Sequence, residues 1–408
     1  MKHLRDERQT SLLRQARESV MFTTNRPPIV FAKGKGAYLW DETGKKYLDF
    51  IAGWAVCALG HSHPAISSAL KIQSRRLINP SPLFYTEPMI EFARQLTTAS
   101  CLDKAFFLST GAEANEGAVK LARKYGAKQL NGAHEIITVW NSFHGRTLAM
   151  MAASGKANFE PLFLPKPEGF ARVPFNDIEA LKAQVSSKTC AIMLEPILGE
   201  GGVYPQSLEY LREVREICSA GNFPLIFDEV QTGFGRTGTL FAYESSGVEP
   251  DIMTLAKGIG GGFPLSALLA KDKFAVFEAG DQGGTYCGTP LAAAVGLAVL
   301  TTIRKERVLD NVVAVGAYLE QQLLRLQEQF PVISEVRGKG LFYGIGLERE
   351  IANDIAARCL ERRLILNAAN PHTIRLMPAL TIGHKEVDAM LTILEKVLKT
   401  LTEEQRES

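Results

Sequence analysis

The feature that most constrains the fold is an alternation of short apolar runs with longer amphipathic stretches between residues 105 and 270. The apolar runs are too short for buried helices and have the length of strands, whereas stretches such as 208–220 have helical periodicity. Strands that alternate with helices form a mostly parallel sheet with helices on both faces. The expected strands are 105–109, 135–140, 190–194, 224–227, 252–255 and 265–270.

The two ends of the chain lack this alternation. Residues 29–50 contain short β-rich pieces around a turn signal at 41–44, and helical periodicity follows at 65–77 and 89–99. A long helix is expected after Pro290 and another over 309–329, before a mixed tail at 332–403. We therefore expect an α/β protein in which a large domain is joined by a smaller α+β domain built from both termini. The expected division is 1–60, 61–303 and 304–408.

Charge and composition exclude several classes of protein. The 408 residues include 46 Lys+Arg and 44 Asp+Glu, a formal net charge of +2, which argues against a nucleic-acid surface built on bulk charge. The longest uncharged stretch, 282–303, is strongly apolar only from 291, too short to span a bilayer. We therefore expect no nucleic-acid partner and no membrane insertion.

The cysteines and the N-terminus favour a cytoplasmic location. The six cysteines are scattered and none forms a C-x-x-C pair, so neither a metal site nor a disulfide framework is expected. Residues 1–19 have no apolar core, and Asp6, Glu7 and Glu18 are unusual for a transit peptide.

A first candidate site lies where the expected strand 105–109 gives way to a helix. Thr110 and Glu113 have the spacing of a capping box, and the small residues Gly111 and Ala112 leave backbone N–H groups uncovered at the positive end of the helix dipole. This arrangement suits an anion such as a phosphate. A well-capped helix without a ligand explains the same residues.

Two charged residues at strand ends form further candidates. Asp228 ends an apolar strand at the edge where α/β sheets bind ligands, and strand alternation places Val230 on the same face. Lys257 follows the next apolar run and precedes a glycine-rich turn. Desolvation lowers the pKa of a lysine, which makes it a nucleophile toward carbonyls. The alternatives are a loop-capping aspartate and a surface lysine.

Two arginines are candidates for binding carboxylates. Arg146 follows Phe143 and His144 on a loop after an expected strand, and Arg375 is the lone cation of an apolar stretch. Guanidinium groups bind carboxylates through two parallel hydrogen bonds. A structural ion pair explains each arginine equally well.

Together, five ordered segments resemble the class-III aminotransferases, which use pyridoxal 5'-phosphate (PLP) on the fold-type-I scaffold. The resemblance extends over residues 28–396. It rests on 109–116, 142–147, 195–202, 228–233 and 256–262.

The resemblance implies a role for each residue around the cofactor. Lys257 is implied to bond covalently to PLP and to shuttle the proton, and Asp228 to keep the pyridine nitrogen protonated. Val230 and Phe143 are implied to cover the two ring faces, and Gln231 to reach the phenolic oxygen.

The resemblance also implies how the phosphate is bound. Gly111 and Ala112 hold it through N–H groups, and Thr285 adds a contact from the neighbouring subunit, so that a homodimer is obligatory. Thr110 and Glu195 complete the implied cofactor set.

For the substrates, the resemblance implies that Arg375 binds the α-carboxylate of glutamate, that Glu200 neutralises Arg375 while the donor is bound, and that Arg146 holds the donor carboxylate. Trp54 is expected near the donor. The implied partners are small molecules: an amino donor and 2-oxoglutarate.

The implied activity is a ping-pong transfer of the terminal amine of N-acetylornithine to 2-oxoglutarate, a step of arginine biosynthesis. Succinylornithine, succinyl-diaminopimelate, ornithine and 4-aminobutyrate are alternative donors. A lyase or aminomutase of the same fold is a more remote alternative. A nicotinamide-dependent dehydrogenase is disfavoured because the dinucleotide fingerprint is missing. No metal is expected.

Overall fold

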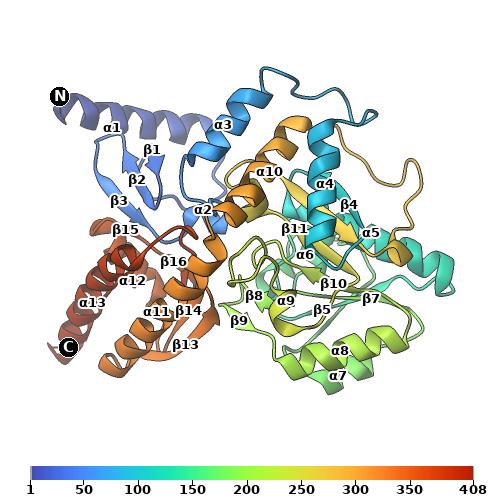
Figure 1. Ribbon diagram of the computed structural model, residues 1–408. Coiled ribbons are helices and arrows are strands. Elements are labelled where there is room, and N and C mark those ends of the chain that lie inside the picture. Colours follow the sequence, from blue (N-terminus) through green and yellow to red (C-terminus); the bar gives the residue numbers. More distant parts are fainter. Residues whose placement is uncertain (1, 408) are drawn as a thin grey trace.

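The computed structural model describes residues 2–407 and divides into a large and a small domain (Figure 1). The large domain contains a seven-stranded sheet in the order β4-β12-β11-β10-β7-β5-β6. Its strands are parallel except β12, which runs antiparallel to both β11 and β4. The strands are β4 (Lys104–Leu108), β5 (Glu135–Val139), β6 (Phe170–Val173), β7 (Thr189–Leu194), β10 (Leu225–Asp228), β11 (Ile252–Leu255) and β12 (Ser266–Ala270).

The expected mostly parallel sheet is therefore confirmed, with one strand added at its edge. The expected strands did not include β6, in which Val173 is buried but the other three residues, Arg172 among them, are only partly buried. An edge strand has one open side and needs no continuous apolar run, so it carries no clear sequence signal.

Two hydrophobic cores, one on each face of this sheet, explain the apolar runs. Ile226 packs in the core under α5 and α6, whereas its neighbour Phe227 packs in the core that includes α8 and α10. Both faces are buried, so the strands have no polar alternation.

The helices of the large domain are α3 (Pro64–Gln73), α4 (Glu87–Ala99), α5 (Gly111–Gln129), α6 (Leu148–Ala153), α7 (Ile178–Gln184), α8 (Leu208–Ala220), α9 (Tyr243–Ser246) and α10 (Pro290–Lys305). The domain also contains the 3-10 turns η1 (Ala157–Phe159), η2 (Lys257–Gly260) and η3 (Asp272–Phe274), and a hairpin of β8 (Ile197–Leu198) and β9 (Tyr204–Pro205).

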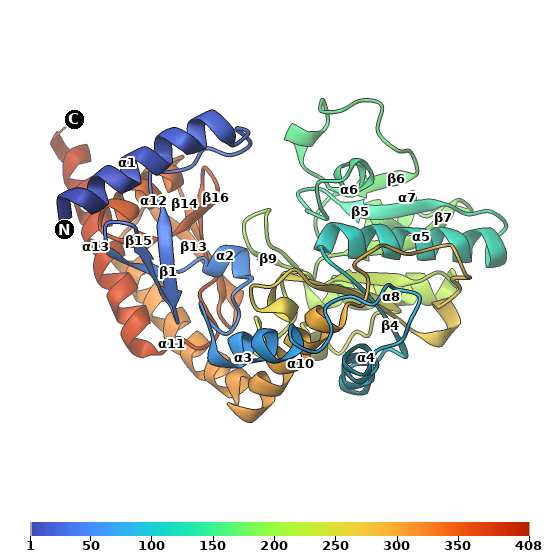
Figure 2. The ribbon, with the colours of Figure 1, turned by 90° about the horizontal axis from the view of Figure 1, so that it is seen from above.

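The small domain is built from both ends of the chain, as expected. Figures 1 and 2 show the blue N-terminal and red C-terminal elements side by side. Their link is a four-stranded sheet in which β15 pairs in parallel with β3. A second sheet has the order β13-β14-β17-β16. The elements are α1 (Lys2–Ser19), β1 (Phe31–Lys35), β2 (Tyr38–Asp41), β3 (Lys46–Asp49), α2 (Ala52–Ala55), α11 (Val308–Gln329), β13 (Ile333–Lys339), β14 (Phe342–Leu347), α12 (Ala352–Glu361), β15 (Leu364–Ile365), β16 (Asn367–Asn370), β17 (Thr373–Leu376) and α13 (His384–Glu407).

One short element has an unusual backbone. All four residues of α2 have φ between 46° and 66°, the left-handed region. The backbone N–H groups of Ala55 and Val56 bond to the carbonyls of Ile51 and Ala52, so the segment is one left-handed helical turn. This turn holds the Trp54 ring 5.3 Å from the guanidinium carbon of Arg375.

Among residues 2–407, no helix combines the length and apolar character needed to cross a bilayer.

Candidate active site

A cavity of about 410 Å³ lies where the carboxyl ends of β10 and β11 meet the N-terminus of α5. Asp228 enters it from the end of β10, and Lys257 follows β11 directly. Val56 of the small domain also lines it, so both domains contribute. The predicted site residues that line the cavity are Thr110, Gly111, Ala112, Phe143, Glu195, Glu200, Asp228, Val230, Gln231 and Lys257.

The N-terminus of α5 forms one wall and has the capping box that the sequence predicts. The Thr110 hydroxyl accepts from the backbone N–H of Glu113 at 3.2 Å, and the Glu113 carboxylate accepts from the N–H of Thr110 at 2.8 Å. The N–H groups of Gly111 and Ala112 lie in the first turn, where the helix offers no acceptor. A Cβ at residue 111 would lie 2.9 Å from Val230 Cγ1, so only glycine fits this close approach.

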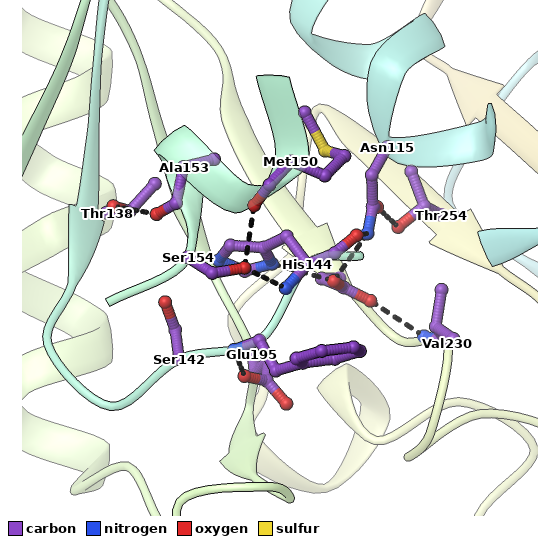
Figure 3. A network of polar contacts seen from close by, with 12 residues as sticks. Asn115, Thr138, Ser142, His144, Met150, Ala153, Ser154, Glu195, Val230 and Thr254 are labelled. Atoms are coloured by element: carbon purple, nitrogen blue, oxygen red, sulfur yellow. Dashed lines mark hydrogen bonds and ion pairs between the residues drawn. The ribbon is translucent and has the colours of Figure 1, made fainter. Parts of the chain in front are cut away.

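Asp228 is held by a buried polar network (Figure 3). Asn115 Nδ2 donates to Asp228 Oδ2 at 2.7 Å, and His144 Nδ1 lies 2.8 Å from the same oxygen. The other oxygen accepts from the backbone N–H of Val230 at 3.0 Å. Burial alone would lower the pKa of His144, but the Asp228 carboxylate raises it above its ordinary value. The network keeps this carboxylate in a fixed orientation beside the cavity.

Three members of this network had no predicted role: Asn115, Thr254, and His144, which the sequence placed only on the loop before Arg146. Asn115 also donates to the His144 carbonyl at 2.8 Å and accepts from the Thr254 hydroxyl at 2.6 Å, linking α5, the 144 loop and β11. Helical periodicity could have predicted Asn115 as a site residue, because it lies four residues after Gly111 and so on the same face of α5. Thr254 had no distinguishing signal within its buried strand.

Lys257 and Glu195 are the titratable groups on two other walls. Burial lowers the pKa of the Lys257 amine, which favours the neutral, nucleophilic form. Burial also raises the pKa of Glu195 to about 7. The Glu195 carboxylate accepts from the N–H groups of Phe143 at 2.8 Å and Gly199 at 3.1 Å, so it ties two cavity loops together.

Arg375 and Glu200 form a buried ion pair beside the cavity. Arg375, on β17, is fully buried, and its Nη1 lies 2.7 Å from Glu200 Oε1. Its Nε donates to Asn367 Oδ1 at 3.0 Å, and the Trp54 ring lies 5.3 Å from its guanidinium carbon. Arg375 Nη2 is buried without a partner among the described residues. The pair thus presents an anion-binding group that a carboxylate side chain currently neutralises.

Besides Arg375, two predicted residues lie outside the cavity lining. Arg146 is exposed, with its guanidinium carbon 5.9 Å from the Phe143 ring and 5.8 Å from the Phe159 ring. Thr285 is exposed on the segment before α10, and its carbonyl accepts from Asn79 Nδ2 at 3.0 Å. Neither reaches the cavity centre within one copy of the chain.

Known proteins with similar sequences share nearly the full length of this chain. The acetylornithine aminotransferase of Ralstonia nicotianae is 50% identical over 389 residues, covering 94% of this chain and 97% of that protein. The acetylornithine aminotransferase of Methanocaldococcus jannaschii is 46% identical over 374 residues, covering 91% and 94%.

Solved aminotransferase structures are also similar to this chain over nearly its full length. The ornithine aminotransferase of Toxoplasma gondii superposes with a TM-score of 0.93 at 32% identity, covering 98% of this chain and 96% of that one. The N-acetylornithine aminotransferase of Stenotrophomonas maltophilia gives 0.82 at 35% identity, covering 96% and 99%. Residues 21–398 match the family model described as aminotransferase class-III. The chain therefore belongs to the class-III aminotransferases.

Proposed function

We propose that this protein is a PLP-dependent aminotransferase that moves the terminal amine of N-acetylornithine to 2-oxoglutarate, giving glutamate and a semialdehyde. The observation that carries the proposal is a single cavity lined by a lysine whose pKa is lowered by burial, a fixed aspartate, and a helix N-terminus at which the N–H groups of Gly111 and Ala112 have no acceptor within the helix. The names of the relatives support N-acetylornithine as the donor and hence a step of arginine biosynthesis.

The residues lining the cavity fit PLP. The N–H groups of Gly111 and Ala112 suit its phosphate. Val230 and Phe143 are apolar groups for the two ring faces, and the fixed Asp228 carboxylate suits a protonated ring nitrogen. Bound PLP supplies an aldehyde that takes up the donor amine and a ring that withdraws electrons from the carbon losing its proton. Thr110, Glu195 and Gln231 complete the proposed cofactor-binding set.

Lys257 is the proposed covalent and proton-moving residue. With PLP bound, the neutral amine of Lys257 would be the group that holds the cofactor covalently, and once freed by the substrate amine it would carry the proton between the substrate and cofactor carbons. The negatively charged Asp228 carboxylate would keep a proton on the ring nitrogen. Asn115 and His144 orient this carboxylate. These roles need a dry site, and burial of both groups provides one.

The two substrates differ in where they carry their carboxylates, and Arg375 distinguishes them in this proposal. Arg375 binds the α-carboxylate of 2-oxoglutarate or glutamate, whereas Glu200 neutralises Arg375 while the donor is bound. Arg146 holds the donor carboxylate at the mouth of the cavity. An unpaired buried guanidinium is costly, which gives the exchangeable partner a physical reason.

We also propose that the active enzyme is a homodimer in the cytoplasm. An apolar surface runs along residues 72–90, and the Asn79 contact fixes the Thr285 segment beside it. In the proposed dimer a second copy covers this surface, and Thr285 contributes a contact to the phosphate site of the neighbouring copy. All six cysteines are free thiols, which suits a reducing compartment. The exposed apolar side chains in question are Ile72, Leu77, Ile78, Leu83, Phe84, Tyr85 and Ile90.

A single-turnover screen tests the donor. The PLP-loaded enzyme is mixed with N-acetylornithine, ornithine or 4-aminobutyrate, and loss of the yellow absorbance is followed. We expect N-acetylornithine to react at least about tenfold faster than ornithine, the discrimination that one substrate group typically supplies. The high structural similarity to an ornithine aminotransferase makes ornithine the second candidate. Bleaching by none of the amines, or an enzyme that takes up no PLP, contradicts the proposal.

A further inference from the structure

A second cation, Lys156, pairs with the Glu200 carboxylate oxygen that Arg375 does not contact most closely. Lys156 Nζ lies 3.7 Å from Glu200 Oε2, whereas Arg375 Nη1 lies 2.7 Å from Oε1. One carboxylate is therefore shared between two cations from different domains. No other lysine or arginine among the described residues forms an ion pair with Glu200.

The backbone next to Lys156 is fixed against the cavity loop. The N–H of Asn141 donates to the Gly155 carbonyl at 2.8 Å, and the N–H of Gly155 donates to the Ser142 hydroxyl at 3.3 Å. The ammonium of Lys156 also lies 5.3 Å from the centre of the Phe143 ring. Lys156 thus occupies a defined position at the edge of the cavity.

The charges of this triad depend on one another. Burial alone would raise the pKa of Glu200, but Arg375 and then Lys156 hold it below its ordinary value. The side chains of Lys156 and Glu200 are each only 21% exposed, whereas Arg375 is fully buried. A Glu200 carboxylate that lost Arg375 without another cation would be a poorly solvated, unpaired charge, which is costly.

We propose that Lys156 is a positioning residue that receives the Glu200 carboxylate when the α-carboxylate of 2-oxoglutarate or glutamate occupies Arg375. This inference rests on the proposed function, because it assigns a second state to the Glu200–Arg375 pair. Lys156 already contacts one carboxylate oxygen, so a small rotation of Glu200 exchanges one ion pair for the other. Lys156 thereby lowers the cost of opening Arg375 to the acceptor and leaves donor binding unaffected.

The test compares binding of an unreactive dicarboxylate with binding of the donor. Glutarate has both carboxylates of 2-oxoglutarate but no carbonyl to react, so calorimetry of the PLP-loaded enzyme measures its Kd without turnover. For Lys156→Met we expect a Kd for glutarate, and a KM for 2-oxoglutarate, about tenfold higher, the size of a partly buried ion pair. The KM for the donor should stay within about twofold, and Lys156→Arg should restore glutarate binding.

Two further variants separate this role from general effects of charge. Lys166→Met removes a lysine from the same loop that pairs with Glu160 and not with Glu200, so glutarate binding should be unchanged. In a Glu200→Gln background there is no charge to relocate, and Lys156→Met should then change the Kd for glutarate by less than about twofold. If the Met variant does not fold, Lys156→Gln replaces it in both backgrounds.

Several results overturn the inference. A full effect of Lys156→Met in the Glu200→Gln background would mean that Lys156 attracts the dicarboxylate directly. A rise in the donor KM instead of the glutarate Kd would make Lys156 a donor-binding residue beside Arg146. An unchanged glutarate Kd refutes the inference alone, whereas a wild-type enzyme that glutamate cannot bleach refutes the proposed function.

Discussion

Replacing Asp49 by Asn should give the enzyme a pH-dependent loss of stability. Asp49 Oδ2 lies 2.7 Å from His61 Nε2, and both side chains are largely buried, with 4% and 16% exposed. The Asp49 carboxylate, together with the Cys57 thiol, raises the pKa of His61 from 6.5 to about 9. Asn keeps an oxygen for the N–H groups of Ile51 and Ala52, which Asp49 Oδ1 accepts at 2.8 and 3.0 Å, so the change isolates the charge.

The sign and size follow from proton linkage. A histidine whose pKa is raised on folding stabilises the protein fully below pH 6.5, and this contribution disappears as the pH rises through about 9. The shift corresponds to about 2.5 kcal/mol at pH 7, which residual solvent access reduces to about 1–2 kcal/mol. For a chain of this size that is a Tm lower by roughly 1–4 °C.

The assay is thermal unfolding of both proteins between pH 6 and pH 10. We expect the difference in Tm to be largest near pH 6 and to vanish by about pH 10. Asp41→Asn is the control, because Asp41 is buried on the same sheet and its partners are Thr43, Lys45 and Tyr47 rather than a histidine. A Tm difference for Asp49→Asn that stays constant from pH 6 to pH 10 would refute the reasoning.

Four further substitutions probe the site. Lys257→Ala should remove the borohydride-reducible link to PLP and slow transamination by about 10⁴-fold; a reducible link that survives would assign it to another lysine. Arg375→Ala should slow the 2-oxoglutarate half-reaction by about 10²-fold or more and the donor half-reaction far less; equal losses would argue against the exchange with Glu200. Asn115→Ala deletes three buried hydrogen bonds and should cost about 3 kcal/mol of unfolding free energy in urea titrations; an unchanged midpoint would show that these bonds do not stabilise the fold. Thr285→Ala should weaken PLP retention about tenfold while the mass in solution stays that of a dimer; unaltered PLP retention would place Thr285 outside the neighbour's site.

The parts of the fold that the sequence predicted well are those with continuous burial. The strands β7, β10 and β11 are buried on both faces, so their apolar runs left no ambiguity. By contrast, α1 was not anticipated, because its residues are mostly exposed and polar and have no apolar stripe. The boundaries at 60 and 303 remain predictions.

For the site, the predicted residues were those at strand ends and at the helix start. The local sequence was enough to predict site residues at the ends of β10 and β11 and in the first turn of α5, and these residues line one cavity. Contacts between residues far apart in the sequence could not be predicted. Asn115 bonds to Asp228 across 113 residues, and Lys156 pairs with Glu200 only because the fold brings their two loops together. Nothing in the local pattern around Lys156 distinguishes it from a solvated surface lysine.

The left-handed turn at 52–55 has a consequence for anyone engineering this enzyme. Three of its residues carry a Cβ in a conformation that costs about 1–2 kcal/mol each, so heat-resistant variants selected from a random library should acquire glycine there. A glycine at residue 52 or 55 would loosen the indole that Trp54 holds over Arg375, and a glycine at residue 54 would remove it. Thermal stability and substrate discrimination therefore place opposite requirements on the residues of this one turn.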